Sequence, residues 1–270
     1  MTKRPLFVIV GAMKCGTTSL HAYLDLHPQI GMSNPKEPNF FNEERTWNRG
    51  LPWFYGLFDP AADVWGESST NYTKFPRFAG VVEKIHHYDP ATRLIYVVRD
   101  PVARVVSHYM TNVAHANEAR TFDEAMADLS DNHYLHTSRY HAQLTQYLRL
   151  FPMEQIRVVE LGELSPENVR ATLRGLFAFV GVDADFDHPD LGVVKHDSSK
   201  KRRPTSVGRA ITHGMPGGKF VRYTLSPLID KPLQKPVVTP ALRRRIEDAL
   251  RPDADALRAL TGRTFSTWSI

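Results

Sequence analysis

A glycine loop near the start of the chain constrains its fold more than any other feature. The apolar run "PLFVIV" at 5–10 leads directly into "GAMKCGTTSL" at 11–20. The run favours a strand, because it is too short for a helix and is bounded by glycine. A strand, a glycine loop and a helix in this order offer backbone N–H groups and the positive end of a helix dipole to an anion. We therefore expect a phosphate-type site at this loop.

The position of the lysine decides which anion the loop suits. Gly11 and Gly16 have the spacing of the nucleotide-binding loop G-x-x-x-x-G-K-[ST], but Thr17 stands at the lysine position and Lys14 lies inside the loop. A lysine after the second glycine reaches the terminal phosphates of a triphosphate, and the hydroxyl after it holds magnesium. Lys14 keeps a cation beside the anion without that arrangement. The loop thus predicts a nucleotide whose reactive group is nearer the 5′ position and which needs no metal.

The order of the remaining segments predicts the fold class. Further strands are expected within 63–70, at 93–98 and at 156–161, and helices at 17–28, 101–115, 138–150 and 166–180. This alternation predicts an α/β fold of three layers, with a central, mainly parallel sheet flanked by helices, in a single domain over 1–270. Ligands of such sheets bind beyond the carboxyl ends of the strands, so the glycine loop and the "RDP" turn at 99–101 should face one site.

The composition limits which cellular compartment and which binding partners we expect for the protein. Cys15 is the only cysteine, and no apolar stretch approaches the ~20 residues that span a bilayer. We therefore expect a cytoplasmic protein without a membrane span. The formal net charge is +5, with basic runs at 200–204 and 243–245. Such runs fit a solvated face or a nucleic-acid surface, and a small anionic ligand needs far fewer charges.

The glycine loop resembles a known family. "KCGTTSL" is similar to the 5′-phosphosulfate loop of sulfotransferases that use 3′-phosphoadenosine 5′-phosphosulfate (PAPS), in which K-x-G-T-T/S-x-L is typical. The resemblance implies that Lys14 stabilises the charge that develops on the oxygen between phosphate and sulfate. It also implies that the loop residues bind the donor: Lys14, Cys15, Gly16, Thr17, Thr18 and Ser19.

A second stretch resembles the 3′-phosphate motif of the same family. In "VVRDPVARVVSHYM" at 97–110, Ser107 follows Arg99 by eight residues. The resemblance implies that both residues bind the 3′-phosphate, and the planar fork of an arginine suits a phosphate well.

A third stretch resembles the acceptor loop of the glycan-type branch, which includes the heparan sulfate enzymes. In "NPKEPNFF" at 34–41 the resemblance implies that Glu37 takes the proton of the acceptor. Glu67 in "WGESSTNY" is the rival carboxylate. Phenol and steroid sulfotransferases use a histidine instead, for which His108 and His115 are candidates.

A late basic loop completes the resemblance. In "SSKKRRPTS" at 198–206, Lys200, Lys201 and Arg202 are the residues implied to contact the 3′-phosphate, although the glycine found in many members is missing. The glycan-type likeness extends over nearly the whole chain and fits a soluble, bacterial-type member.

The resemblance implies a P-loop-like fold and a definite reaction. A sulfuryl group would move from PAPS to a hydroxyl, or to an amine, of a glycan, a glycolipid or a secondary metabolite, leaving 3′-phosphoadenosine 5′-phosphate (PAP). The alternatives from other classes are a P-loop kinase or NTPase, motivated by the spaced glycines, and a nucleic-acid-binding module, motivated by the basic runs.

Overall fold

The computed structural model describes residues 3–193, 202–203 and 231–270. Its centre is a five-stranded sheet in the order β2-β3-β1-β4-β5, in which every neighbouring pair is parallel. The strands are β1 (Leu6–Gly11), β2 (Ile30–Met32), β3 (Val64–Ser68), β4 (Arg93–Val98) and β5 (Ile156–Glu160). A separate antiparallel pair joins β6 (Arg202–Arg203) and β7 (Lys231–Pro232).

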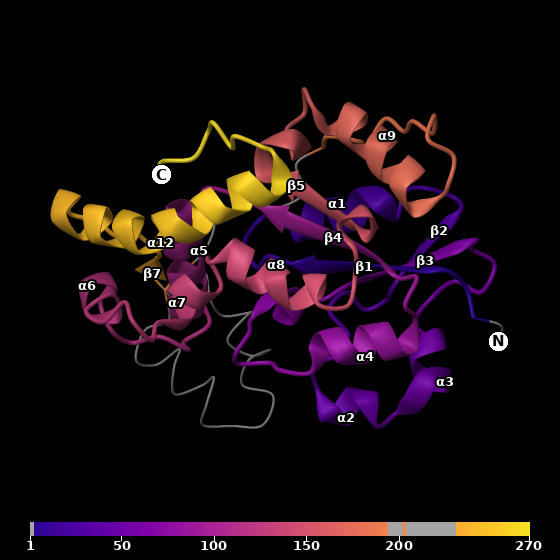
Figure 1. The fold of residues 1–270 in the computed structure, drawn as a ribbon, viewed down its shortest axis with the longest axis horizontal. Helices are drawn as coiled ribbons and strands as arrows, with labels where there is room; N and C mark the ends of the chain where they lie inside the picture. Colours follow the sequence, from indigo (N-terminus) through magenta and orange to yellow (C-terminus); the bar gives the residue numbers. More distant parts are fainter. Residues whose placement is uncertain (1–2, 194–201, 204–230) are drawn as a thin grey trace.

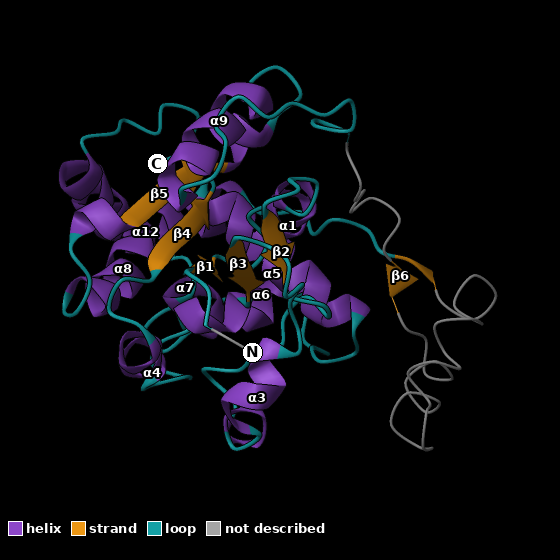
Figure 2. Ribbon diagram, turned by 90° about the vertical axis from the view of Figure 1, so that its right-hand side faces the viewer, coloured by secondary structure: helices purple, strands orange, loops and turns teal. Residues whose placement is uncertain are grey.

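Helices cover both faces of the sheet. Helices α1 and α9 lie on one face, while α4 and α8 lie on the other (Figure 1; Figure 2). The longer helices are α1 (Thr17–Leu24), α4 (Val81–Tyr88), α5 (Pro101–Ala114), α8 (Tyr140–Leu148), α9 (Val169–Val180) and α12 (Pro240–Thr261). The short ones are α2 (Glu44–Trp47), α3 (Gly50–Tyr55), α6 (Phe122–Ala125), α7 (His133–His136), and the 3₁₀ turns η1 (Thr70–Thr73), η2 (Met153–Gln155) and η3 (Leu161–Leu164). The predicted three-layer α/β fold is confirmed.

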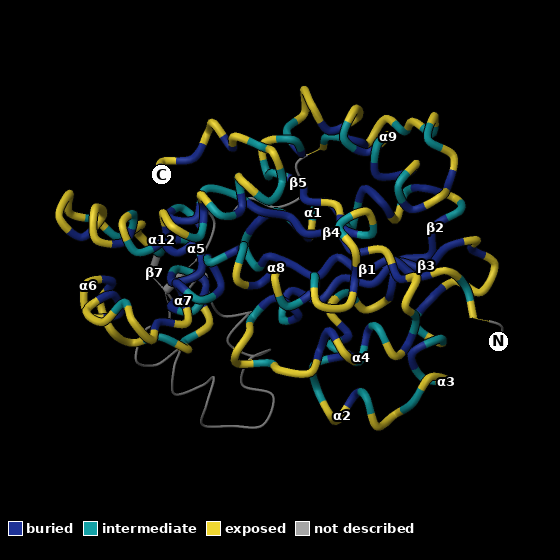
Figure 3. The backbone as a smooth tube through the Cα atoms, viewed as in Figure 1, coloured by how far each residue is buried: buried dark blue, intermediate teal, exposed yellow. Residues whose placement is uncertain are grey.

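Burial explains why the central strands β1 and β4 are apolar along nearly their whole length. Every residue of β1 and β3 is buried, and β4 is buried except for its first residue, Arg93. Strands of a parallel sheet that helices cover on both faces have no solvent side, so they read as continuous apolar runs (Figure 3). Strand β3 departs from this pattern, because Glu67, which is charged by type, and the polar Ser68 are both completely buried.

The register brings the carboxyl ends of the central strands together. Ile9 of β1 lies opposite Ser68 of β3 on one side and Ile95 of β4 on the other. The segments that follow these strands therefore leave the sheet at the same edge, as the order of elements predicts. The glycine loop, η1 and the Arg99 turn all start there.

The predicted helix at 17–28 is wrong beyond Leu24. The backbone N–H groups of Leu26 and His27 donate to Tyr23 O and Leu24 O, three residues back, so the chain tightens into a turn before Pro28. His27 is buried in this turn, where its ring packs against Phe177 and Phe186.

No helix within the described ranges combines the length and the apolar character that a bilayer crossing requires.

Candidate functional site

The glycine loop between β1 and α1 contains a left-handed backbone conformation that glycine adopts readily. Gly16 precedes α1 with φ 94°, in the left-handed region. A Cβ atom there would lie 2.6 Å from Leu161 Cδ1 and would strain the backbone at this positive φ, so the position favours glycine. Among the described residues, no side chain caps α1. The N–H groups of its first turn, from Thr17 onward, therefore stay available to an anion.

Arg99 joins the second predicted motif to the glycine loop. It follows β4, and its Nη1 donates a hydrogen bond of 3.2 Å to Lys14 O. Its Nε is buried and has no hydrogen-bond partner within the described part of the chain. The neighbouring Asp100 does not pair with Arg99, because its Oδ1 caps α5 by accepting from Ala103 N at 2.6 Å. The guanidinium is thus held in place with a donor to spare.

One cleft of about 630 Å³ brings the predicted motifs together. Its walls come from the glycine loop, the acceptor loop, the Arg99 turn and α5, which are far apart in sequence. The cleft is lined by eight of the predicted site residues: Lys14, Gly16, Thr17, Thr18, Ser19, Glu37, Arg99 and Ser107.

Of the four other predicted donor-binding residues, the structure describes Cys15 and the backbone of Arg202. Cys15 is buried with Sγ 3.5 Å from Tyr140 Oη, and burial raises the pKa of its thiol. Its side chain therefore belongs to the core and not to the cleft. Lys200 and Lys201 lie outside the described residues. The backbone of Arg202 lies in β6, opposite Pro232 of β7.

Glu37 lies at the acceptor side of the cleft. Its backbone N–H donates to Ser68 O at 3.0 Å, which ties the loop to the end of β3. Its carboxylate Oε1 lies 2.8 Å from Lys36 Nζ and accepts from Thr70 Oγ1 at 3.3 Å, with 39% of the side chain exposed. The carboxylate can therefore be reached from the cleft.

The rival carboxylate, Glu67, has a different environment. It is completely buried and does not line the cleft. Its Oε1 accepts hydrogen bonds from Ser69 Oγ at 2.5 Å and Tyr72 Oη at 3.2 Å. Burial raises the pKa of Glu67 to about 8. A carboxyl group enclosed in this way has no access to an acceptor in the cleft.

The two candidate histidines also differ. His115 lines the cleft. His108 lines a separate cavity of about 230 Å³ beside Lys74 and His133. Its Nδ1 lies 3.3 Å from Nη1 of the buried Arg104, and burial together with that guanidinium lowers the pKa of His108. His108 is therefore neutral and faces away from the cleft.

Other residues of the cleft carry no sequence prediction. Tyr23 and Thr70 line it from α1 and η1. Leu161, Leu164 and Ser165 line it from the segment after β5. The rule that sites form beyond strand ends could have indicated Thr70 and the η3 segment, since both follow strands of the sheet.

Within the ranges that the structure describes, no three His, Cys, Asp or Glu side chains gather in a way that could hold a metal ion.

The comparison with protein families decides the family. The sulfotransferase domain family matches residues 4–215, which include the glycine loop, the Glu37 loop and the Arg99 turn. This chain belongs to the sulfotransferase family. Membership in this family argues against the two alternative functions, a P-loop kinase or NTPase and a nucleic-acid-binding module. The basic run at 243–245 also has intramolecular contacts, because Arg243 pairs with Glu247 at 3.0 Å and Arg245 donates to Ala127 O.

The relatives of this sulfotransferase-family chain include glycan-modifying enzymes. Mouse heparan sulfate glucosamine 3-O-sulfotransferase 3A1 is 30% identical over 188 residues, which cover 66% of this chain and 46% of that protein. Human bifunctional heparan sulfate N-deacetylase/N-sulfotransferase 2 is 27% identical over 202 residues, which cover 66% of this chain and 22% of that protein. The chain thus spans less than half the length of these two relatives.

A solved structure covers the whole chain. The crystal structure of a sulfotransferase from Alicyclobacillus acidocaldarius matches with a TM-score of 0.71 and 26% identity, over 100% of both chains.

Proposed function

We propose that this chain transfers a sulfuryl group from PAPS to a hydroxyl, or to an amine, of a glycan, glycolipid or secondary-metabolite acceptor. The observation that carries the proposal is the single cleft that Lys14, Glu37, Arg99 and Ser107 share. The names of the two relatives favour a glycan acceptor, because one names heparan sulfate glucosamine 3-O-sulfation and the other names N-sulfation of heparan sulfate.

The residues at the cleft fit the donor nucleotide. Arg99 Nε is a buried donor without a partner in the described residues, and a 3′-phosphate would supply the missing acceptor. Ser107 lines the same cleft and adds a hydroxyl. At the other end, the N–H groups that begin α1 suit the 5′-phosphosulfate.

The chain would contribute charge stabilisation and proton removal. The donor supplies a sulfuryl group on a phosphate leaving group. Lys14 and the first amides of α1 would stabilise the negative charge that develops on that phosphate. Glu37 would accept the proton of the acceptor, because among the described residues it is the carboxylate that lines the cleft. The burial of Glu67 and the separate location of His108 favour Glu37 over both.

Sulfate-labelled PAPS and a panel of glucosamine-containing oligosaccharides test this proposal. The wild-type chain should bind PAP in calorimetry and transfer label to at least one acceptor. Glu37→Gln should lower kcat by about a hundredfold or more, the range of a lost general base, while PAP still binds. Glu43→Gln is the matched control, because Glu43 lies near the same loop and its carboxylate pairs with Arg45 at 3.6 Å. Full activity of Glu37→Gln would exclude it as the base, and a wild-type chain that does not bind PAP would refute the donor.

A further inference from the structure

Glu67 connects β3 to the loop that carries Glu37. It lies opposite Val8 of β1, near the carboxyl end of β3. Its Oε1 is the common acceptor of two hydroxyl groups, Ser69 Oγ at 2.5 Å and Tyr72 Oη at 3.2 Å. All three residues are buried. One carboxyl oxygen therefore fixes the orientation of two hydroxyl groups on the segment after β3.

Both hydroxyl groups in turn hold the backbone of the Glu37 loop. Ser69 Oγ accepts from Asn39 N at 3.0 Å, and Tyr72 Oη accepts from Phe41 N at 3.1 Å. Glu37 N itself donates to Ser68 O at 3.0 Å. Alternate residues of the loop are thus bound to the β3–η1 segment, and two of the three bonds depend on a hydroxyl that Glu67 orients.

The loop needs such restraint because its backbone is unfavourable. Glu37 has φ 59° and Asn39 has φ 54°, in the left-handed region that side chains with a Cβ disfavour. A loop without these bonds would relax toward ordinary backbone angles. The carboxylate of Glu37 would then leave the position in which it lines the cleft.

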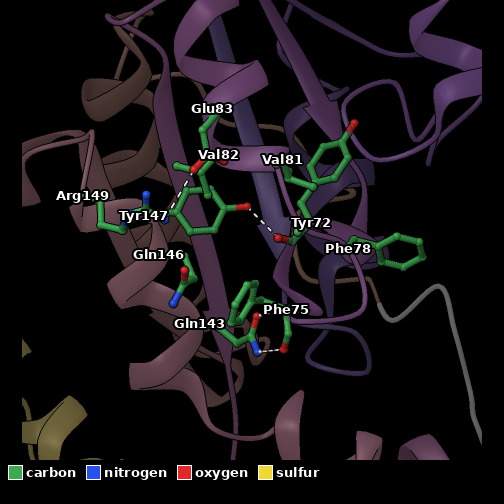
Figure 4. Close-up of a pocket in the computed structure, with 12 residues that line it drawn as sticks. Tyr72, Phe75, Phe78, Val81, Val82, Glu83, Gln143, Gln146, Tyr147 and Arg149 are labelled. Carbon is green, nitrogen blue, oxygen red and sulfur yellow. Dashed lines mark hydrogen bonds and ion pairs between the residues drawn. The ribbon is translucent and has the colours of Figure 1, made fainter.

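Tyr72 is also held from the opposite side. Tyr147 Oη of α8 donates to Tyr72 O at 2.8 Å, and Gln143 Nε2 donates to Phe75 O at 2.7 Å (Figure 4). The first bond holds the backbone of η1 and the second holds the segment just after it, whereas the hydroxyl of Tyr72 points to Glu67. The two sets of contacts can therefore be removed independently.

We propose that Glu67 is a positioning residue, which orients Ser69 and Tyr72 so that they hold the Glu37 loop in its catalytic conformation. The effect on transfer rests on the function proposed above, whereas the effect on the loop does not.

The protonation of Glu67 suits this role. Oε1 already accepts two hydroxyl groups, and Oε2 has no hydrogen-bond partner within the described residues. Since burial raises the pKa of Glu67 to about 8, the carboxyl group keeps its proton at neutral pH, and Oε2 is the oxygen free to carry it. A glutamine has the same shape, with its amide oxygen in place of Oε1. Glu67→Gln should therefore preserve the network, while Glu67→Leu removes it.

Amide hydrogen exchange and steady-state kinetics test the proposal together. The N–H of Phe41 should exchange faster in both Glu67→Leu and Tyr72→Phe, and that of Asn39 in Glu67→Leu. In both variants kcat should fall by about tenfold or more, as for a misplaced catalytic group, at unchanged PAP affinity. Glu67→Gln should keep the slow exchange and a kcat within about threefold of wild type, because the acceptor oxygen remains. Tyr147→Phe is the matched control, since it also removes one buried tyrosine hydroxyl but leaves the Glu67 network intact.

Three outcomes would overturn the proposal. The first is wild-type exchange at Asn39 and Phe41 in both Glu67→Leu and Tyr72→Phe. The second is equal acceleration in the Tyr147→Phe control. The third is loss of activity in Glu67→Gln with exchange still slow, which would make Glu67 chemically active. If Glu67→Leu does not fold, Ser69→Ala replaces it, because it removes the hydroxyl that joins Glu67 to Asn39 N and leaves the link through Tyr72 in place. If the wild-type chain transfers no sulfate, the exchange results still decide the matter.

Discussion

Glu37 and Glu67 are two neighbouring carboxyl groups whose environments give them different roles. Glu37 and Glu67 interact electrostatically, and each lies near Lys36. Glu37 is exposed to the cleft, whereas Glu67 is enclosed by the sheet and two hydroxyl groups. Burial penalises the charged form of a carboxyl group, so Glu67 retains its proton where an exposed glutamate would lose it.

This proton gives the stability of the protein a defined pH dependence. Between the ordinary pKa of 4.5 and the folded pKa of about 8, folded Glu67 keeps a proton that the unfolded chain releases. The folded state then binds more protons, so this contribution to the free energy of unfolding is full below pH 4.5 and is lost as the pH rises toward 8.

Urea denaturation of wild type and Glu67→Gln at about pH 5, 6, 7 and 8 measures this contribution. The difference in the free energy of unfolding, wild type minus variant, should fall by a few kcal/mol in total, the order of magnitude that proton linkage gives for a pKa shift of this size. A difference that stays level or rises with pH would contradict a buried, protonated Glu67.

The sequence predicts a site residue well when the residue belongs to a short motif, and poorly when its position depends on contacts with distant segments. Lys14, Glu37, Arg99 and Ser107 belong to short motifs that follow strands or begin helices, and the fold brings all four to one cleft. The Cys15 side chain instead points into the core, where it contacts Tyr140, 125 residues away, and the motif contains no sign of this contact. The link between Glu67 and the Glu37 loop likewise depends on contacts between segments that are distant in sequence.

Helix α12 supplies the N-terminal cap that helix α8 lacks. Helix α8 has no side-chain cap from its own N-cap residue, Arg139. Asp253 of α12 supplies one, because its Oδ2 and Oδ1 accept from His141 N and Ala142 N, both at 2.9 Å. A carboxylate at a helix N-terminus satisfies unpaired N–H groups and interacts favourably with the helix dipole.

Removal of this cap should destabilise the protein measurably. Asp253→Ala should lower the free energy of unfolding by about 1–2 kcal/mol, the usual value of an N-cap. Asp248→Ala is the control on the same helix, because Asp248 is exposed and lies within α12 rather than against α8. Chemical denaturation at neutral pH compares the two variants with wild type. Equal stability of both variants would show that the contacts to α8 contribute nothing.

The elements that sequence reasoning found are those with strong local patterns. The strands at 93–98 and 156–161 and the helix after Pro101 agree with β4, β5 and α5 to within a residue or so. Strand β2 has only three residues, too few to show a period. Helix α12 has a clear signal that the basic run at 243–245 obscured, since its buried residues recur at helical spacing: Leu242, Ile246, Leu250, Ala254 and Leu257.

At the scale of the whole molecule, packing links the last helix to the first strand. Helix α12 contacts α8 and α5, and its buried residues join the same hydrophobic core as β1 and β4. A shared core predicts that these parts unfold together, as a single domain would.

Calorimetry in the absence and presence of PAP tests this prediction. Thermal unfolding should give one transition, and PAP at about 100 times its Kd should stabilise the whole transition by about 2.7 kcal/mol. Two separate transitions, of which PAP shifts only one, would contradict a single cooperative unit.

The hydrogen bond from Arg99 to Lys14 O has a consequence for nucleotide discrimination. One guanidinium reaches the loop proposed to serve the 5′ end of the donor, and its Nε, which has no partner among the described residues, is available to the proposed 3′-phosphate. A nucleotide without a 3′-phosphate would leave that donor unpaired, and the same side chain would be less firmly held against the loop that carries Lys14. Such a nucleotide would therefore bind more weakly and, once bound, would also react more slowly. The effects on binding and on rate multiply, so one side chain would give a strong preference for the 3′-phosphorylated nucleotide.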